Sequence, residues 1–238
     1  MSAPWTLHGG HQQVLGAIGL RLSPAHGAEV MGGAFAGPAQ HEAAVALLTA
    51  VLVAQPWLYA YAEAHLLPVE ALEAAGLRQV SAYTRMSGPL PADLPSVPEG
   101  FRIVPLSEVE SLPDRLAAQQ TYSDMIGHTI VPPEFVLPGA GGCDEGLSRL
   151  AYDPSGAAVG ICRVWRDGVE VACTTPGVRP ALRASGLRRA LLLSVCAAAR
   201  AAGAARLKLE AWGDSEEQRA EDMALGLSVE VVTPIYSA

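Results

Sequence analysis

Val178-Arg-Pro-Ala-Leu-Arg-Ala-Ser-Gly-Leu-Arg-Arg-Ala-Leu191 is the stretch that best indicates the fold of this chain. It joins a strand-like segment, residues 170–175, to an apolar helix predicted over about residues 186–202. Four of the sixteen Lys and Arg residues lie in its loop and first helical turn, namely Arg179, Arg183, Arg188 and Arg189. Because a helix N-terminus favours negative charge, each cation there is unfavourable by roughly a few tenths of a kcal/mol. Either an anion is bound there by backbone N–H groups and arginines, or the loop is a solvated basic patch.

The composition bounds the class of protein. The chain has 238 residues, of which 50% are hydrophobic and 17% charged, so it can build a full core in one large domain or two small ones. The net charge of −8 disfavours nucleic acid or an anionic membrane as a partner, since either needs a basic surface. The arginine-rich loop is a local exception and indicates a small anionic ligand.

The cysteines indicate a reducing environment. Cys143, Cys162, Cys173 and Cys196 show neither C-x-x-C pairing nor metal-ligand spacing, so no metal is predicted. The last three lie in apolar runs and are expected to pack as small hydrophobic residues. This usage favours the cytoplasm, and the N-terminus lacks the basic start and apolar core of a signal peptide.

One uncharged segment, residues 43–62, is long enough to span a bilayer. Gln55-Pro56 interrupts it, and Glu42 and Glu63 bracket it without basic anchors. We therefore expect a buried helix followed by a buried strand, and no membrane partner.

Residues 87–100 hold four prolines and two glycines, a composition typical of a linker. We predict a first domain over residues 1–90, a linker over residues 91–100 and a second domain over residues 101–238. The predicted elements are strands at 13–22, 28–35, 57–63 and 77–86 with helices at 41–55 and 67–75, and then strands at 101–104, 147–152, 157–165, 170–175, 206–210 and 227–236 with helices at 113–126, 186–202 and 215–225.

The order of elements also indicates an internal repeat. A strand, a helix and a Gly-Leu pair at residues 57–77 recur at residues 206–227, and a helix precedes each set. The loop at residues 36–40, before the first of these helices, has no arginine and no glycine at the helix start. If the halves are duplicates, only the second retains an anion site.

Two motifs of the second half match those of a known family. Val178-Arg-Pro180 precedes Arg183-Ala-Ser-Gly186-Leu-Arg188, and a later strand and helix end in Ala224-Leu-Gly-Leu227. With them, residues 101–238 resemble the GNAT (GCN5-related) N-acetyltransferases, whose signature is Val-x-Pro, then Arg/Gln-x-x-Gly-x-Gly/Ala opening a long helix, and later Leu-Gly-Phe. The first ninety residues resemble a truncated, degenerate GNAT half, as in tandem members of that family.

The resemblance implies an α/β (α+β) fold with a mixed, mostly antiparallel sheet flanked by helices. It also implies acetyl-CoA as co-substrate, with its pyrophosphate held by backbone N–H groups at the helix start and its arm between strands 170–178 and 206–211. The cofactor-binding residues that it implies are Val178, Arg183, Ala184, Ser185, Gly186, Leu187 and Arg188.

Two positions depart from the family pattern. Arg188 replaces a small residue, and its side chain would either crowd the phosphates or turn outward and pair with one. Asp222 replaces the tyrosine that often protonates the departing thiolate, and either a different tyrosine, with Tyr236 as the candidate, or a water could substitute. Because the attacking amine must be neutral, a base is needed, and Glu210 and Glu170 are candidates if burial raises their pKa. Either carboxylate could instead be structural or solvated.

We therefore expect an N-acyltransferase that moves an acetyl group from acetyl-CoA to a small-molecule or peptide amine by direct attack. His128 and Asp144, in the irregular region that shapes the acceptor pocket in this family, are candidate acceptor contacts or simply loop residues. One alternative is a non-catalytic CoA-binding or interaction module with a degenerate GNAT fold. Another is a structural role in which the first half buries against the second or mediates a homodimer.

Overall fold

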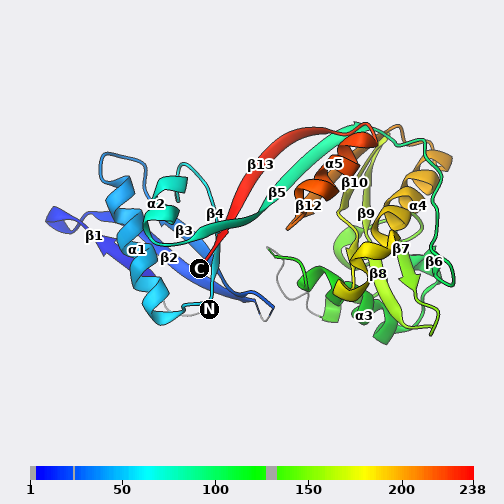
Figure 1. Cartoon of the computed structure of the whole chain (residues 1–238), viewed down its shortest axis with the longest axis horizontal. Coiled ribbons are helices and arrows are strands. Elements are labelled where there is room, and N and C mark those ends of the chain that lie inside the picture. Colours follow the sequence, from blue (N-terminus) through cyan, green and yellow to red (C-terminus); the bar gives the residue numbers. More distant parts are fainter. Residues whose placement is uncertain (1–3, 24, 127–132) are drawn as a thin grey trace. The chain divides into compact units, whose positions relative to one another are not determined.

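The computed structural model describes residues 4–23, 25–126 and 133–238. The chain forms two compact units (Figure 1). The first unit consists of Met1–Tyr83 and Thr233–Ala238, and the second of Thr84–Val232. The mixed α/β architecture predicted from the sequence is confirmed, with a mostly antiparallel sheet flanked by helices in each unit.

The first unit contains a sheet in the order β1-β2-β3-β4, with the end of β13 beside β4. Its elements are β1 (Trp5–His8), a 3₁₀ helix (Gly10–Gln12), β2 (Val14–Ser23), β3 (Gly27–Ala34), α1 (Gln40–Ala54), β4 (Tyr59–Tyr61), α2 (Val69–Ala74) and the start of β5 (Arg78–Pro89). Helix α1 buries Leu48 and Val51 in a core shared with Ile18 and Leu20 of β2. The apolar segment at residues 43–62 is thus a core helix followed by a strand, as predicted. Within the described residues no helix is long and apolar enough to cross a membrane.

The second unit has helices on both faces of its strands. Its elements are β6 (Arg102–Pro105), a 3₁₀ helix (Leu106–Glu108), α3 (Leu112–Ser123), 3₁₀ helices (Pro133–Val136 and Ala140–Gly142), β7 (Arg149–Tyr152), β8 (Ala158–Cys162), β9 (Val164–Asp167), β10 (Glu170–Thr174), β11 (Gly177–Val178), a 3₁₀ helix (Pro180–Ser185), α4 (Leu187–Ala201), β12 (Arg206–Trp212), α5 (Glu216–Ala224) and β13 (Ser228–Ser237). Leu191 of α4 shares one apolar cluster with Val159 of β8, whereas Tyr122 of α3 shares another with Ile161. Because both of its faces are covered, β8 is buried along its whole length.

The strands of the second unit separate at one point, which we call the fork. Strand β10 pairs in parallel with β12 as far as Thr174 opposite Glu210. Beyond that point β11 pairs with β8 instead, with Val178 opposite Gly160. The sheet of the second unit is therefore divided in two, β13-β5-β12-β10-β9 on one side and β11-β8-β7-β6 on the other. The fork opens at the carboxyl ends of β10 and β12, directly before α4.

The proline-rich segment does not divide the units. Residues 84–100 belong to the second unit, where Leu90 is buried and its N–H donates to the carbonyl of Ala205. The guanidinium of Arg200 donates to the carbonyl of Pro91. The prediction of an interdomain linker at residues 91–100 is corrected, because composition reports the stiffness of a segment and not what it packs against.

The two halves of the chain share one order of elements. Each has an antiparallel meander, a helix, a strand parallel to the last strand of that meander, a second helix and a closing strand. The closing strand of the first half, β5, lies beside β12 in the second unit from Thr84 onward, and β13 lies beside β4 in the first unit from Thr233 onward. Each half therefore gives the end of its last strand to the other unit's sheet.

We predict that removal of residues 233–238 selectively unfolds the first unit. The N–H of Ala62 donates to Pro234 (2.8 Å between N and O), and the buried Ile235 pairs with Tyr61. Loss of this strand leaves an edge of β4 unpaired and opens the core. Hydrogen exchange would show Ala62 deprotected while the Arg179 amide, bonded to Val159 in the second unit, keeps its protection. Equal loss of protection at both amides would contradict this assignment.

Candidate active site

The loop before α4 leads into a helix that begins within one residue of the predicted start. Pro180–Ser185 makes a 3₁₀ helix, and Gly186 then takes a left-handed conformation with φ of 82° before α4 begins at Leu187. That conformation disfavours any residue with a Cβ. A Cβ built on Gly186 would meet no atom within 4 Å, so the space beside its backbone is open.

The start of α4 is only partly capped by the chain itself. The hydroxyl of Ser185 donates to the carbonyl of Leu182 (2.6 Å) and accepts from the N–H of Leu187 (3.3 Å). The N–H groups of Arg188 and Arg189 lie in the first turn, where a helix supplies no backbone acceptor. Two N–H donors thus remain for a ligand, beside exposed residues 183–186.

The arginines of the loop have partners within the chain. Arg189 forms an ion pair with Asp93 (2.6 Å), and Arg183 donates to the backbone carbonyl of Asp124 (3.0 Å). Arg188 turns inward, so the prediction that its side chain crowds or pairs with a phosphate is wrong. Arg179 is exposed at the start of the loop, and Val178 lies in the core. The misplaced positive charge at this helix start is therefore largely compensated by the protein.

Arg188 lies at the centre of a buried ion cluster that spans the fork. Its Nε donates to Thr175 Oγ1 (3.1 Å), which follows β10, and its Nη2 donates to Asp214 Oδ2 (3.0 Å), which follows β12. Nη1 and Nη2 also bind both oxygens of Asp222 on α5, at 3.0 and 2.6 Å. The side chains of Arg188, Asp214 and Asp222 are only 8%, 2% and 1% exposed. One guanidinium therefore joins two strand ends and two helices.

Burial and the neighbouring charges shift the pKa values of Arg188 and Asp214. Burial by itself lowers the pKa of Arg188, but Asp214 and Asp222 more than offset this and raise the pKa above its ordinary value. Burial raises the pKa of Asp214, an effect that Arg188 opposes and Asp222 strengthens. Among the described residues, Asp214 Oδ1 is buried and has no hydrogen-bond partner.

Sequence reasoning noticed Arg188 and Asp222 separately and missed both their pairing and Asp214. A signal was present, because the two positions that depart from the family pattern carry opposite charges. In the structure the arginine and the aspartate at these two positions bind each other. Nothing in the sequence marked Asp214, because only the fold brings it next to Arg188.

The three predicted catalytic side chains do not meet. Glu210 is half-buried at the fork, where its carbonyl accepts from the N–H of Thr175 (2.6 Å). Within the part of the chain that the structure describes, its carboxylate has no hydrogen-bond or ion-pair partner. Glu170 lies at the other end of β10, about 13 Å away at roughly 3.3 Å per residue, and binds Lys208 (2.6 Å). Tyr236 belongs to the first unit's core and contacts Glu73 (3.3 Å).

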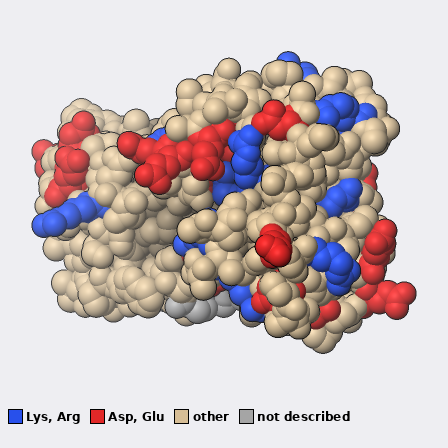
Figure 2. All heavy atoms as spheres, turned by 45° about the vertical axis from the view of Figure 1, so that its right-hand side comes forward, with Lys and Arg blue, Asp and Glu red and all other residues tan. Residues whose placement is uncertain are grey.

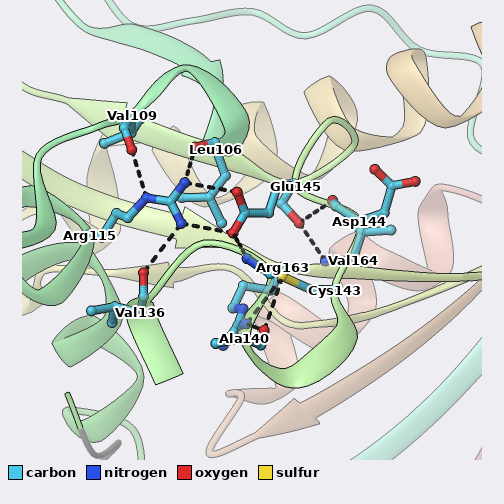
Figure 3. A network of polar contacts seen from close by, with 12 residues as sticks. Leu106, Val109, Arg115, Val136, Ala140, Cys143, Asp144, Glu145, Arg163 and Val164 are labelled. Atoms are coloured by element: carbon cyan, nitrogen blue, oxygen red, sulfur yellow. Dashed lines mark hydrogen bonds and ion pairs between the residues drawn. The ribbon is translucent and has the colours of Figure 1, made fainter. Parts of the chain in front are cut away.

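The irregular region beneath α3 is held by a second buried network (Figure 3). Arg115 binds both oxygens of Glu145 at 2.8 Å and donates to three backbone carbonyls. The hydrogen bond from Arg115 is the main cause that lowers the pKa of Glu145. Asp144 caps the N–H of Leu147 (3.0 Å) and has a local structural role, whereas His128 lies outside the described residues. This network holds the loops around α3.

The cysteines and the charged side chains are also candidate ligand sites. All four cysteines are buried and unpaired, which confirms the prediction that Cys162, Cys173 and Cys196 pack as small hydrophobic residues. No group of three His, Cys, Asp or Glu side chains in the described ranges is placed to hold a metal ion. On the face drawn in Figure 2, basic side chains lie in separate groups among acidic and uncharged ones.

The fold is similar to solved structures of GCN5-related N-acetyltransferases. One from Sphaerobacter thermophilus is 19% identical, with a TM-score of 0.58 over 99% of this chain and 80% of that chain. A tandem GNAT protein from the clavulanic acid biosynthesis pathway is 16% identical, with a TM-score of 0.50 over 99% of this chain and 82% of that one. A probable N-acyltransferase from Enterococcus faecalis V583 is 11% identical, with a TM-score of 0.55 over 95% and 59%.

No family model matches the sequence, and no curated protein sequence does either. At the identities above, structural likeness establishes the fold, which is the mixed α/β fold of GNAT proteins.

We predict that Arg188→Met is far more destabilising than Arg189→Met, although the two residues are adjacent and each pairs with aspartate. Loss of Arg188 leaves two buried carboxyl groups without their cation, at a cost of about 3–5 kcal/mol. Arg189 and Asp93 are 42% and 55% exposed, so loss of that pair is worth about 0–1 kcal/mol. Chemical denaturation measures both.

A double-mutant cycle tests whether Arg188 acts through Asp222. If it does, Arg188→Met combined with Asp222→Leu costs less than the sum of the single changes. Additive costs would show that the pair is not energetically coupled.

Proposed function

We propose that this chain is an N-acyltransferase that moves an acetyl group from acetyl-CoA to an amine by direct attack. The observation that supports it best is the junction of the fork with α4. There two strands separate, and Gly186 opens a helix whose N–H groups at residues 188 and 189 have no helical acceptor. In this proposal those N–H groups and the loop backbone at residues 183–186 hold the pyrophosphate, and the arm lies in the fork.

The comparisons support the same assignment at the level of fold. The similar proteins include acetyltransferases, and the structure of the tandem GNAT protein was determined without AcCoA. We further propose that the first half is a truncated repeat of the second. Loop residues 36–40 of the first half lack the arginines of residues 179–189, so the proposed cofactor site lies in the second unit alone.

We predict that acetyl-CoA raises the melting temperature by an amount that grows with ligand concentration. A ligand at 100 times its Kd adds about 2.7 kcal/mol to the free energy of unfolding. Gly186→Ala should reduce this shift, because the new methyl group enters the open space beside the loop backbone. Gly203→Ala is the matched control, since Gly203 at the other end of α4 has a similar φ of 86° and equally open surroundings. An unmoved melting temperature at millimolar acetyl-CoA would refute the proposal.

For the chemistry, we assign the base to Glu210. It lies at the fork with a carboxylate that has no partner among the described residues, whereas Glu170 is already engaged by Lys208. A base placed there could take the proton of the attacking amine, directly or through a water. Tyr236 is withdrawn as the acid, because its hydroxyl is bound to Glu73 in the first unit.

Glu210→Gln should lower the rate of CoA release by about 10²–10⁴-fold while leaving the acetyl-CoA-induced melting shift intact. Glu170→Gln, a change of the same size on the paired strand, should leave that rate unchanged. The measurement is CoA release over a broad panel of amines. Equal effects of the two substitutions would argue that neither carboxylate is the base.

A second candidate function is a CoA-binding or interaction module without turnover. The specific observation in its favour is that the Arg188–Asp222 pair occupies the two positions where the family pattern has a small residue and a tyrosine. Binding of acetyl-CoA without CoA release for any amine in the panel would favour this candidate over the enzyme.

A further inference from the structure

The buried ion cluster at the fork contains one more carboxyl group than it has cations. Arg188 is its guanidinium, and Asp214 and Asp222 are both almost fully enclosed. With both carboxyl groups ionised, the cluster would bury a net negative charge, which a protein interior strongly disfavours. One bound proton makes the cluster neutral.

The hydrogen bonds identify the carboxyl group that keeps this proton. Both oxygens of Asp222 accept from Arg188, an arrangement that suits a carboxylate. Arg188 donates to Asp214 Oδ2, and a hydrogen bond with Thr175 also favours the ionised form of Asp214. The buried Oδ1 of Asp214 has no hydrogen-bond partner among the described residues. A proton on Oδ1 therefore breaks no existing contact, whereas a proton on Asp222 would disrupt a bidentate pair.

We propose that Asp214 holds a proton in the folded protein and donates it to the thiolate that departs from acetyl-CoA. This inference rests on the proposed function. Asp214 follows the end of β12, and Arg188 connects it to Thr175 at the end of β10. Asp214 thus lies beside the ends of the two strands between which we propose that the arm of the cofactor binds. It would protonate the thiolate, a step for which the carboxylate of Asp222 is unsuited.

The step balances without any further reagent. The amine nitrogen forms a bond to the acetyl carbon, and the carbon–sulfur bond breaks with its electron pair remaining on sulfur. The proton of Asp214 moves to that sulfur, while the amine loses its proton to Glu210. The products are an amide and CoA as a free thiol, and a proton passed back from Glu210 through solvent restores Asp214.

Among the described residues, four other titratable groups lie in or beside the cluster, namely Arg188, Asp222, Cys173 and Cys196. Arg188 on α4 has a raised pKa and stays charged, and Asp222 on α5 is its carboxylate partner. The pKa of Cys173 on β10 is raised by its contact with Cys162 and by burial, and burial raises that of Cys196 on α4. Both thiols therefore stay protonated. Burial also raises the pKa of Asp214.

The proton is tested first in the free protein, where acetyl-CoA plays no part. In protein labelled with ¹³C at the aspartate carboxyl carbons, the Asp214 signal should titrate well above the usual aspartate pKa of about 3.9. The Asp214 signal is identified by its absence from the spectrum of Asp214→Asn. If that variant fails to fold, the signal is assigned by correlating the carboxyl carbon with the backbone atoms of Asp214. Because the folded state binds this proton more tightly, wild-type stability relative to Asp214→Asn should fall as pH rises through this range. Titration at or below the usual value would overturn the proposal.

The donor role is tested by turnover and by binding together. Asp214→Asn should lower CoA release by about 10²–10⁴-fold with an unchanged acetyl-CoA melting shift, and Asp214→Glu should recover part of the rate. Wild-type activity should fall as pH rises through the pKa of Asp214, and Asp214→Asn should lack that fall. Asp93→Asn, which alters only the exposed partner of Arg189, is the control.

The outcomes separate the two proposals. A protonated Asp214 whose substitution leaves turnover unchanged would overturn the donor role while the acyltransferase assignment stands. A wild-type chain that shows neither acetyl-CoA binding nor turnover would overturn the assignment and the donor role with it, whatever the titration shows.

Discussion

The guanidinium of Arg188 is the interaction on which the second unit depends. It connects the residues that follow β10 and β12, the two strands that diverge, and it ties α4 to α5 through Asp222. Without this cation, two enclosed carboxyl groups would lie beside the fork with nothing to neutralise them. The same contact explains how an arginine is tolerated in the first turn of a helix, where positive charge is otherwise unfavourable. Its charge is offset by aspartates of the chain and requires no bound anion.

Much of the fold followed from local pattern. The apolar runs, the Asp-Gly and Gly-Leu turn signals and the long helix after Gly186 predicted most strands and helices. The four-residue β1 was missed, and β8 and β9 were predicted as one strand over residues 157–165 although they lie in different sheets. What local pattern could not supply was the partner of each segment. The proline-rich stretch packs within the second unit because Leu90 and Pro91 find contacts there. Likewise, the sequence placed Glu170 and Glu210 on the correct strands, but only the parallel register put them at opposite ends.

In the candidate site, too, features set by neighbouring residues could be predicted, whereas contacts between distant segments could not. The left-handed glycine and the helix start were predictable because they depend on neighbouring residues. The ion cluster was not, because Thr175, Arg188, Asp214 and Asp222 come from four separate segments. Arg188 and Asp222 each differ from the family pattern, and in the structure they belong to one ion cluster that also includes Asp214. A buried carboxyl group with one oxygen unpartnered among the described residues then suggests an acid where this chain lacks the tyrosine of the family pattern.

The path of β13 has a consequence for how the protein is made. The sheet of the first unit needs residues 233–238 beside β4, yet these are translated long after the rest of that unit. A nascent chain must therefore wait with an unpaired strand edge and an open core while the entire second unit is synthesised. The first half cannot reach its final state on the ribosome ahead of the second. The first unit is therefore completed only after β13 has been synthesised.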